Sequence, residues 1–389
     1  MTIPVDPLLP LDPTARTTPL RIRALMLPGI ALLAILVIGL ASSLYALFVN
    51  NGELPAGTVS WSGLAGGETT AAVAHFLQTA NPLEDSLVTF DRVSSYVLTG
   101  DLGARVRRGC GNWLFLTDEL VVHPERAANA AKHVQIVEQV ASFLKSRSIG
   151  LTIVPVPDKS RVEAAELCGV DRPVAINGRL ADFQSQLTQS GVGVVDILRS
   201  MDATGGELYY RTDTHWNERG AKAAADGVAA ALRRAGLAPT QKAEFHVVTD
   251  PPQERVGDLI RLAGLGHVAW PFRPHGDEES ATVIEQSAAA NVGILDETPA
   301  PELAVIGTSF SRRANFVPFL SLALAAPVEN RSFDDGGITK AAIAYFASPE
   351  FLKSPPRAVV WEIPERMIEE DVPASDEQWA KSLGVAPSR

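Results

Sequence analysis

Short apolar runs alternate with longer amphipathic segments along most of this chain. Runs rich in Val, Ile and Leu without a polar alternation predict buried strands, and they lie at 151–157, 192–198, 302–307 and 357–363. Helical periodicity predicts helices at 127–150, 178–191, 218–236 and 314–325. A further aromatic-apolar strand, bounded by glycines, is expected within 109–120.

Strands that alternate with helices predict an α/β fold with a mainly parallel sheet covered by helices on both faces. We expect one such domain over residues 100–389. Residues 240–298 interrupt the alternation with proline and acidic clusters, which indicates an insertion or peripheral lobe.

The N-terminal part contains a long apolar segment instead of alternating strands and helices. Residues 24–49 carry no charge, and this run is longer than the roughly 20 residues that span a bilayer core. Arginines precede it and the first charge after it is Glu53, so residues 1–23 are expected on the cytoplasmic side and the rest outside. A cleaved signal peptide is the competing interpretation, although the run exceeds the usual apolar core of about 7 to 15 residues. Residues 50–99 are expected to form a Gly- and Ser-rich linker to about residue 70 and then a helix.

Charge and cysteine content narrow the possible functions. The 389 residues carry a formal net charge of -11, which argues against nucleic-acid binding because that needs a basic face. The two cysteines, Cys110 and Cys168, are not in a CxxC motif. In an exported domain they could form a disulfide, but the sequence does not show whether they lie close enough.

The segment YYRTDTHWNERG, residues 209–220, places an acid and an imidazole two residues apart. In extended backbone Asp213 and His215 would share a face, so the carboxylate could fix the imidazole tautomer for proton transfer. A pair of metal ligands and a buried structural histidine are the alternatives. Asn217 is placed to cap the helix that follows.

A serine follows a predicted strand in ELAVIGTSFSRRANF. Ser309 would stand at the carboxyl end of that strand, where open α/β sheets bind ligands, and a following helix N-terminus could stabilise an oxyanion. Gly307 would permit a sharp turn. Alternatively, Ser309 or Ser311 caps the helix and has no chemical role.

Several motifs in this order resemble the AlgX/AlgJ family of periplasmic polysaccharide O-acetyltransferases, which have an SGNH-hydrolase-like three-layer α/β/α fold. The motifs are GNWLFL, VPVPDKSRVE, RTDTHWNERGAKAAAD, VIGTSFS and VVWEIPER. The acid and histidine precede the serine, which is the permuted order of this group. The resemblance implies Ser309 as nucleophile, His215 as general base and acid, and Asp213 as the residue that orients His215. It implies no cofactor, and no metal site is expected.

Weaker candidates surround this set. Asn315 matches an asparagine of the family after the serine motif and is a candidate oxyanion donor, or a structural residue. Lys159 and Arg211 could contact an anionic polymer or form structural ion pairs. Tyr210 could stack on a sugar or fill the core.

The resemblance also implies surroundings for the protein. We expect a single-pass protein of the bacterial inner membrane with its catalytic domain in the periplasm, a polysaccharide acceptor, and an acetyl donor supplied by a multi-pass membrane acyltransferase. The short segment after residue 370 leaves no room for a carbohydrate-binding module, as in the AlgJ arrangement. An acetyl esterase of the same fold and a non-catalytic scaffold of an export complex are the alternative functions.

Overall fold

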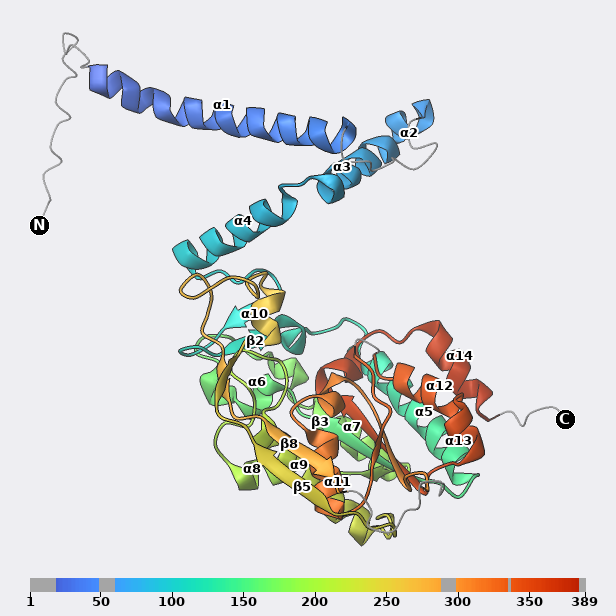
Figure 1. Cartoon of the computed structure of the whole chain (residues 1–389). Coiled ribbons are helices and arrows are strands. Elements are labelled where there is room, and N and C mark those ends of the chain that lie inside the picture. Colours follow the sequence, from blue (N-terminus) through green and yellow to red (C-terminus); the bar gives the residue numbers. More distant parts are fainter. Residues whose placement is uncertain (1–18, 49–59, 288–298, 335–336, 385–389) are drawn as a thin grey trace, which may run out of the picture. The chain divides into compact units, whose positions relative to one another are not determined.

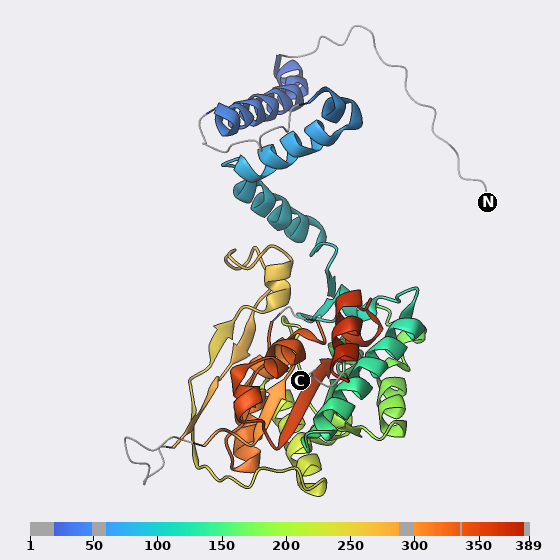
Figure 2. The ribbon, with the colours of Figure 1, turned by 90° about the vertical axis from the view of Figure 1, so that its right-hand side faces the viewer.

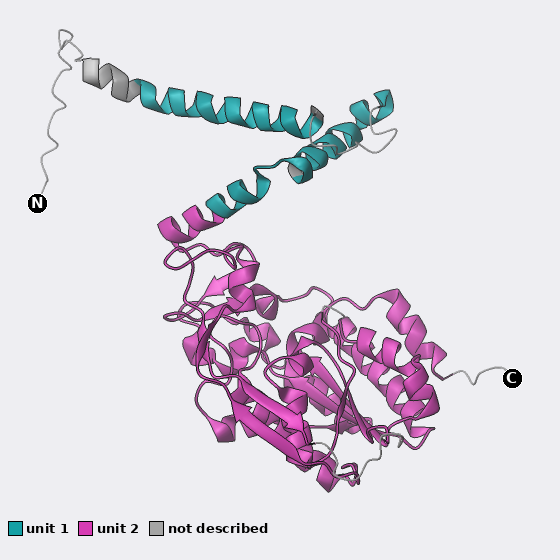
Figure 3. Cartoon of the chain, in the orientation of Figure 1, with its two compact units in different colours: residues 1–91 teal, residues 92–389 magenta. Residues whose placement is uncertain are grey.

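The computed structural model of the protein describes residues 19–48, 60–287, 299–334 and 337–384. The chain divides into two compact units, residues 1–91 and 92–389 (Figure 3). Helix α4 (Glu84–Thr99) begins in the first unit and ends in the second.

The first unit is helical. Helix α1 (Pro19–Phe48) contains the apolar stretch Met26–Leu47, which is long enough to cross a membrane. Helices α2 (Trp61–Gly66) and α3 (Glu68–Ala80) follow it. The expected linker therefore already contains helix from residue 61 onward, since the Ser60 hydroxyl accepts the Gly63 N–H at 3.0 Å and caps α2; its residues 51–59 lie outside the described part.

The single helix expected before residue 100 is in fact two. Helix α3 ends at Ala80 and α4 begins at Glu84. Pro82 lies between them, and proline supplies no N–H to continue a helix. The Asn81 side chain accepts the Leu83 N–H at 3.0 Å and fixes the break.

The second unit is built on a five-stranded sheet in the order β10-β9-β11-β3-β4. All neighbouring pairs are parallel, as the sequence predicted. The strands are β3 (Gly150–Val156), β4 (Gly193–Val194), β9 (Leu303–Ile306), β10 (Glu329–Asn330) and β11 (Ala358–Pro364). The strand expected at 192–198 is shorter, because the Asp196 carboxylate accepts the Arg199 N–H and starts helix α8 (Ile197–Thr204).

The side chains of each central strand alternate between two cores. In β9, Leu303 and Val305 belong to one buried cluster, whereas Ala304 and Ile306 belong to the other. The first core is covered by α8, α9 (Glu218–Arg234) and α11 (Phe316–Leu324). Five helices cover the second: α5 (Arg126–Lys145), α7 (Arg179–Gln189), α12 (Lys340–Phe346), α13 (Pro349–Lys353) and α14 (Ala374–Ser382). This is the expected three-layer α/β/α arrangement, and Figure 1 shows α9 and α11 on one side of β3 and α5, α12 and α14 on the other.

Within the described part of the chain, three small ribbons lie outside the central sheet. The strand expected within 109–120 is β2 (Leu114–Leu116), which pairs antiparallel with β1 (Val106–Arg108). Residues 240–287 form the ribbons β5 (Phe245–Thr249) with β8 (Thr282–Gln286) and β6 (Gln253–Arg255) with β7 (Asp277–Glu279). Helix α10 (Asp258–Leu262) lies between β6 and β7 in the chain, and Figure 2 shows this lobe in yellow beside the layered sheet. Residues 288–298 of the expected insertion lie outside the described part.

Candidate active site

Three side chains from two distant segments form a hydrogen-bonded row. The His215 Nε2 atom lies 2.8 Å from Ser309 Oγ, and His215 Nδ1 lies 2.6 Å from Asp213 Oδ1. Asp213 and His215 are buried, with 1% and 6% of their surface exposed. The geometry fits a serine hydroxyl that donates to Nε2 while the Nδ1–H group donates to the carboxylate, which is the arrangement that general-base catalysis requires.

A tight hairpin-like turn, residues 209–216, presents the acid and the imidazole and is called the catalytic turn below. Tyr209 and Trp216 pair as an antiparallel bridge, and the Tyr210 N–H donates to the His215 carbonyl at 3.2 Å. Trp216 is fully buried against Phe310, with ring centroids 5.2 Å apart. Phe310 also contacts the His215 ring at 4.8 Å. Phe310, the residue after Ser309, therefore packs against both His215 and Trp216 and holds the serine motif next to the histidine motif. Asn217 caps α9 as predicted, accepting the Gly220 N–H at 2.9 Å.

Both oxygens of Asp213 are occupied. Oδ1 accepts the His215 backbone N–H at 3.0 Å in addition to Nδ1, and Oδ2 accepts the Asp258 N–H at 3.0 Å. The Arg255 guanidinium lies 2.9 Å from Oδ2. Burial alone would raise the pKa of Asp213, but the hydrogen bond and charge of His215, together with Arg255 and the Asp258 N–H, hold it well below its usual range. Asp213 is therefore a carboxylate at all physiological pH values.

The imidazole has an unusually favourable environment for a proton. Burial lowers the pKa of His215, but the hydrogen bonds and negative charges of Asp213 and Asp258 outweigh it, so the pKa is raised above its ordinary value. A more basic His215 takes the serine proton more readily.

The segment that carries Ser309 is held by a buried acid. Glu362 of β11 is fully buried, and its carboxylate accepts the Thr308 N–H at 2.7 Å and the Ser311 hydroxyl at 3.0 Å. A Cβ on Gly307 would lie 2.5 Å from Glu362 Oε2. Glycine is thus needed for close approach of the backbone to this carboxylate, rather than for the sharp turn that the sequence suggested.

The hydroxyl of Thr308, rather than that of Ser309 or Ser311, accepts a capping hydrogen bond, from the Phe310 N–H at 3.3 Å. The element that follows is a short 3-10 turn, Ser309–Arg312, and α11 begins only at Phe316. Among the described residues, the Ser309 N–H has no acceptor. This N–H is free to donate to an oxyanion that forms beside Ser309 Oγ.

Of the two roles considered for Lys159, polymer contact and a structural pairing, its surroundings favour the structural one. Its side chain is fully buried, and Nζ donates to the carbonyls of Leu114 at 2.6 Å, Arg211 at 2.9 Å and Asp213 at 3.0 Å. Burial lowers the pKa of Lys159 to about 8, even though nearby carboxylates oppose the shift. Lys159 therefore ties the β2 strand to the catalytic turn and cannot reach a polymer.

The other weak candidates are placed beside the site. Asn315 donates its amide N–H groups to Glu218 at 2.8 Å and to the Thr282 carbonyl, which directs the amide to these structural partners. Tyr210 is buried, and its hydroxyl donates to Glu279. The Arg211 guanidinium is half-exposed and pairs with Glu207. Tyr210 and Arg211 both line a cavity of about 510 Å³, which keeps a ligand-contacting role open to Arg211.

The lobe formed by residues 240–287 contributes directly to the catalytic turn, and sequence reasoning missed these residues. Asp277 accepts the Thr212 N–H at 3.1 Å and the Thr212 hydroxyl at 2.5 Å. Arg255 and Asp258 contact Asp213 and His215 as described above. No periodicity marks these residues; the only available signal was the clustering of acidic residues across the lobe.

Asp213, His215 and Asp258 offer ligand atoms within 4.8 Å of one another. The Arg255 cation already lies 2.9 Å from Asp213 Oδ2, and the imidazole nitrogens face Ser309 and Asp213. A divalent cation among these atoms would have to replace the proton that His215 Nδ1 donates to the Asp213 carboxylate. The donor set therefore fits a proton relay better than a metal centre.

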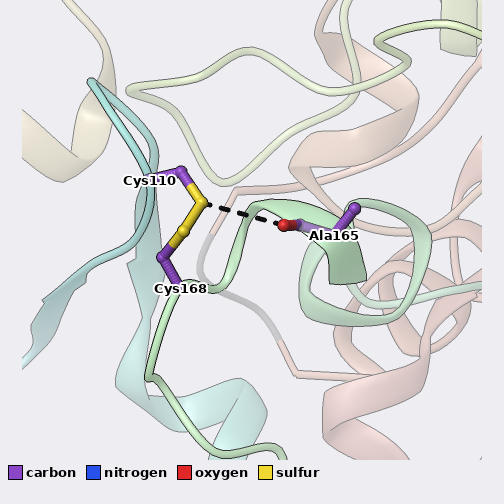
Figure 4. Close-up of a disulfide and its surroundings, with 3 residues drawn as sticks. All are labelled: Cys110, Ala165 and Cys168. Carbon is purple, nitrogen blue, oxygen red and sulfur yellow. Dashed lines mark hydrogen bonds between the residues drawn. A yellow bond between two sulfur atoms is a disulfide. The ribbon is translucent and has the colours of Figure 1, made fainter.

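A disulfide lies next to the β2 strand. Cys110 and Cys168 are bonded, with their Cα atoms 5.0 Å apart and a sequence separation of 58 residues (Figure 4). The Cys110 N–H also donates to the Glu166 carbonyl at 2.8 Å. The bond connects the turn before β2 to the segment after α6 (Lys159–Val162). Helix α6 contains the buried Lys159. Disulfides of this kind are typical of exported domains.

Comparisons with known proteins agree with this architecture. The family model described as "SGNH hydrolase-like domain, acetyltransferase AlgX" matches residues 106–365. The probable alginate O-acetylase AlgJ of Azotobacter vinelandii is 28% identical over 301 residues, covering 75% of this chain and 77% of the relative. The AlgJ of Pseudomonas aeruginosa is 28% identical over 298 residues, covering 72% and 75%. The O-acetyltransferase domain of Pseudomonas putida AlgJ superposes with a TM-score of 0.63 at 26% identity, covering 72% of this chain and 98% of that structure.

The parallel sheet between two layers of helices, with a serine after one of its strands, together with this family match, identifies an SGNH hydrolase-like domain. Within that class, the chain belongs to the AlgX acetyltransferase family, and it is similar to the AlgJ relatives named above.

Proposed function

We propose that this chain is an O-acetyltransferase that moves acetyl groups onto an exported polysaccharide through an acetyl-enzyme on Ser309. Membership of the AlgX acetyltransferase family supports the type of reaction. The names of the relatives, alginate O-acetylases, support a polysaccharide acceptor. The observation that carries the mechanism is the row of hydrogen bonds from Asp213 through His215 to Ser309.

In the first half-reaction, Ser309 Oγ attacks the carbonyl carbon of the acetyl donor while His215 Nε2 takes the serine proton. The Ser309 N–H donates to the oxyanion, and Asp213 stabilises the imidazolium. The intermediate collapses, and His215 gives the proton to the leaving group. Ser309 then carries the acetyl group as an ester.

In the second half-reaction, a sugar hydroxyl of the polymer attacks the acetyl carbon. His215 takes the hydroxyl proton and returns it to Ser309 Oγ as the ester bond to serine breaks. The products are the O-acetylated sugar and free enzyme. The acetyl donor would be supplied from a multi-pass membrane acyltransferase, and helix α1 would hold the domain at the outer face of the inner membrane beside it.

Cells that lack the gene, complemented with the wild-type chain or with Ser309→Ala, test this proposal. The measurement is the acetyl content of the purified exported polysaccharide. The proposal predicts that the wild type restores acetylation and Ser309→Ala does not, with equal amounts of both proteins in the cell envelope. Full acetylation with Ser309→Ala would favour a scaffold. Acetylation that is higher in the deletion strain than in the wild type would identify an esterase.

A further inference from the structure

A second carboxylate stands beside the catalytic histidine, and it comes from the lobe rather than from the catalytic turn. Asp258 is the first residue of α10. Its Oδ2 atom lies 3.3 Å from His215 Nδ1, the same nitrogen that contacts Asp213. The side chain is largely buried, with 26% of its surface exposed.

The backbone of the lobe fixes where this carboxylate lies. A Cβ on Gly257 would lie 2.0 Å from the Thr212 carbonyl oxygen, so only glycine allows the lobe to approach the catalytic turn this closely. The Leu259 N–H donates to the same carbonyl at 3.2 Å, and the Asp258 N–H donates to Asp213 Oδ2 at 3.0 Å. Two backbone hydrogen bonds therefore hold the start of α10 on the catalytic turn.

The Asp258 side chain is itself oriented by the residue between the acid and the histidine. Oδ1 accepts the Thr214 N–H at 2.7 Å, and Oδ2 accepts the Thr214 hydroxyl at 2.6 Å. A carboxylate with two donors from one residue has a defined direction. This direction places Oδ2, which has lone pairs left, next to the imidazole.

Asp258 differs from Asp213 in the positive charges that lie near it. The Arg255 guanidinium pairs with the Asp213 oxygen that is remote from the imidazole, and also with Glu279. Lys159 lies on the other side of the turn, on the Asp213 carbonyl, and Arg366 lies over the Phe310 ring at 5.3 Å. Asp258, by contrast, has His215 as its only ion-pair partner among the described residues. Its negative charge is thus left to act on the imidazolium.

We propose that Asp258 is a positioning residue that supplies the second negative charge for the His215 imidazolium, acting with Asp213 on the Nδ1–H group. When His215 takes the proton from Ser309, the new positive charge lies between two carboxylates. Asp213 fixes the tautomer and stabilises the charge, and Asp258 adds a second stabilising charge. The inference rests on the proposed function, because it assumes that His215 acts as a base toward Ser309.

The test measures the pH dependence of Ser309 modification by a small sulfonyl fluoride, on the full-length chain in detergent. This reaction needs the base but neither acetyl donor nor polysaccharide. Wild type is compared with Asp258→Asn, which removes the charge, and with Asp258→Glu, which keeps it. Asp226→Asn is the matched control, because Asp226 is exposed and pairs with Lys222 on α9. Asp258→Ser serves as a second neutral variant if Asp258→Asn does not fold, as judged by circular dichroism.

The proposal predicts that a neutral residue at 258 moves the midpoint of the rate profile to lower pH by roughly 0.5 to 1, because the imidazolium loses a stabilising charge that solvent partly screens. The rate on the plateau falls roughly 3- to 10-fold as the base weakens. Asp258→Glu keeps the midpoint of the wild type, and Asp226→Asn changes nothing.

Two results would overturn the inference alone: a lower plateau with an unchanged midpoint in the neutral variants, or a profile identical to that of the wild type. The first would reduce Asp258 to a structural partner of Thr214. A wild-type chain whose Ser309 is not modified, or is modified equally in His215→Ala, would instead overturn the proposed function and this inference with it.

Discussion

At the scale of single residues, the site depends on charges that are largely removed from solvent. His215 is buried between two carboxylates and a serine hydroxyl. Because the free imidazole must accept the serine proton, the rate of acetyl-enzyme formation should rise with pH through the His215 pKa.

The first prediction concerns that pH profile. The pKa of His215 is raised above the ordinary value of 6.5, so the midpoint of the rate profile should lie above 6.5 and activity should be lost as the pH falls below it. Asp213→Asn should lower the plateau by about 10⁴-fold, because the wrong tautomer is then favoured. Stopped-flow measurement of nitrophenol release from 4-nitrophenyl acetate gives both quantities. A wild-type midpoint clearly below 6.5 would refute the assignment of His215 as the base.

The second prediction concerns Lys159. Lys159→Met keeps much of the side-chain volume but leaves three buried carbonyls without their donor. We expect a loss of about 3 kcal/mol in the free energy of unfolding, since each unsatisfied buried acceptor is costly. Urea unfolding followed by circular dichroism measures this loss. The control is Lys222→Met, at an exposed lysine that pairs with Asp226, which should change the stability by less than about 0.5 kcal/mol. Equal stability of the two variants would argue against the tie between β2 and the catalytic turn.

At the scale of elements, the nucleophile is positioned by two neighbouring strands. β9 delivers Ser309, and β11 delivers the Glu362 carboxylate that holds Thr308 and Ser311. Burial raises the pKa of Glu362, although the N–H and hydroxyl donors oppose the shift. The neighbouring strand β11 therefore holds the loop after β9 through the Glu362 carboxylate.

Gly307→Ala tests this support. The new Cβ would lie 2.5 Å from Glu362 Oε2 and 2.8 Å from its Cβ, so the loop or the strand must move. Displacing Ser309 by about 1 Å should lower the rate of acetyl-enzyme formation by roughly 10²-fold. Gly66→Ala is the matched control, because nothing lies within 4 Å of the added methyl group there. Unchanged kinetics of Gly307→Ala would show that the close contact with Glu362 is not needed for catalysis.

The elements also show what the sequence could predict. Strands β3, β9 and β11 were predictable because both of their faces are buried, which produces unbroken apolar runs. Strand β10 has two residues, too few for any periodicity, and was not predicted, whereas β4 was predicted but is shorter than expected. Asp213, His215 and Ser309 were proposed from their local motifs and the family resemblance, and in the structure His215 lies within hydrogen-bonding distance of both Asp213 and Ser309.

Residues whose role depends on long-range contacts were not predictable. The full burial of Lys159 was not predicted, because lysine is seldom fully buried. Arg255 and Asp258 were missed because their contacts cross more than forty positions of chain to reach Asp213, and nothing in a single sequence records such a contact. Gly307 was noted in the sequence, but the reason for a glycine there is the close approach of Glu362, which lies 54 residues after the neighbouring Thr308.

At the scale of the whole molecule, an apolar helix precedes the catalytic unit. The stretch Met26–Leu47 meets the length and composition of a membrane span, but a signal sequence near the N-terminus would do so as well. The two interpretations differ in the mass of the mature protein.

The prediction is that the chain remains whole and stays with the membrane. Intact-mass measurement of the protein purified from cells should include the residues of α1, and alkaline carbonate should not extract it from membranes. Residues 92–389 behind a cleavable signal peptide should fold and become soluble in the periplasm, because this unit has its own cores. A mature protein that begins after residue 41 would instead identify a cleaved signal peptide.

The central claim is that Ser309 carries the acetyl group between donor and polymer. The most direct measurement is the mass of the full-length chain, both intact and after digestion to peptides. It is made after brief exposure to 4-nitrophenyl acetate, with and without an acceptor oligosaccharide. We expect the wild type to gain one acetyl group on the peptide that contains Ser309, and to lose it to the oligosaccharide when acceptor is added. Ser309→Ala should gain none at that peptide. A wild type that gains no acetyl group, or a Ser309→Ala variant that acetylates the oligosaccharide equally well, would contradict the account.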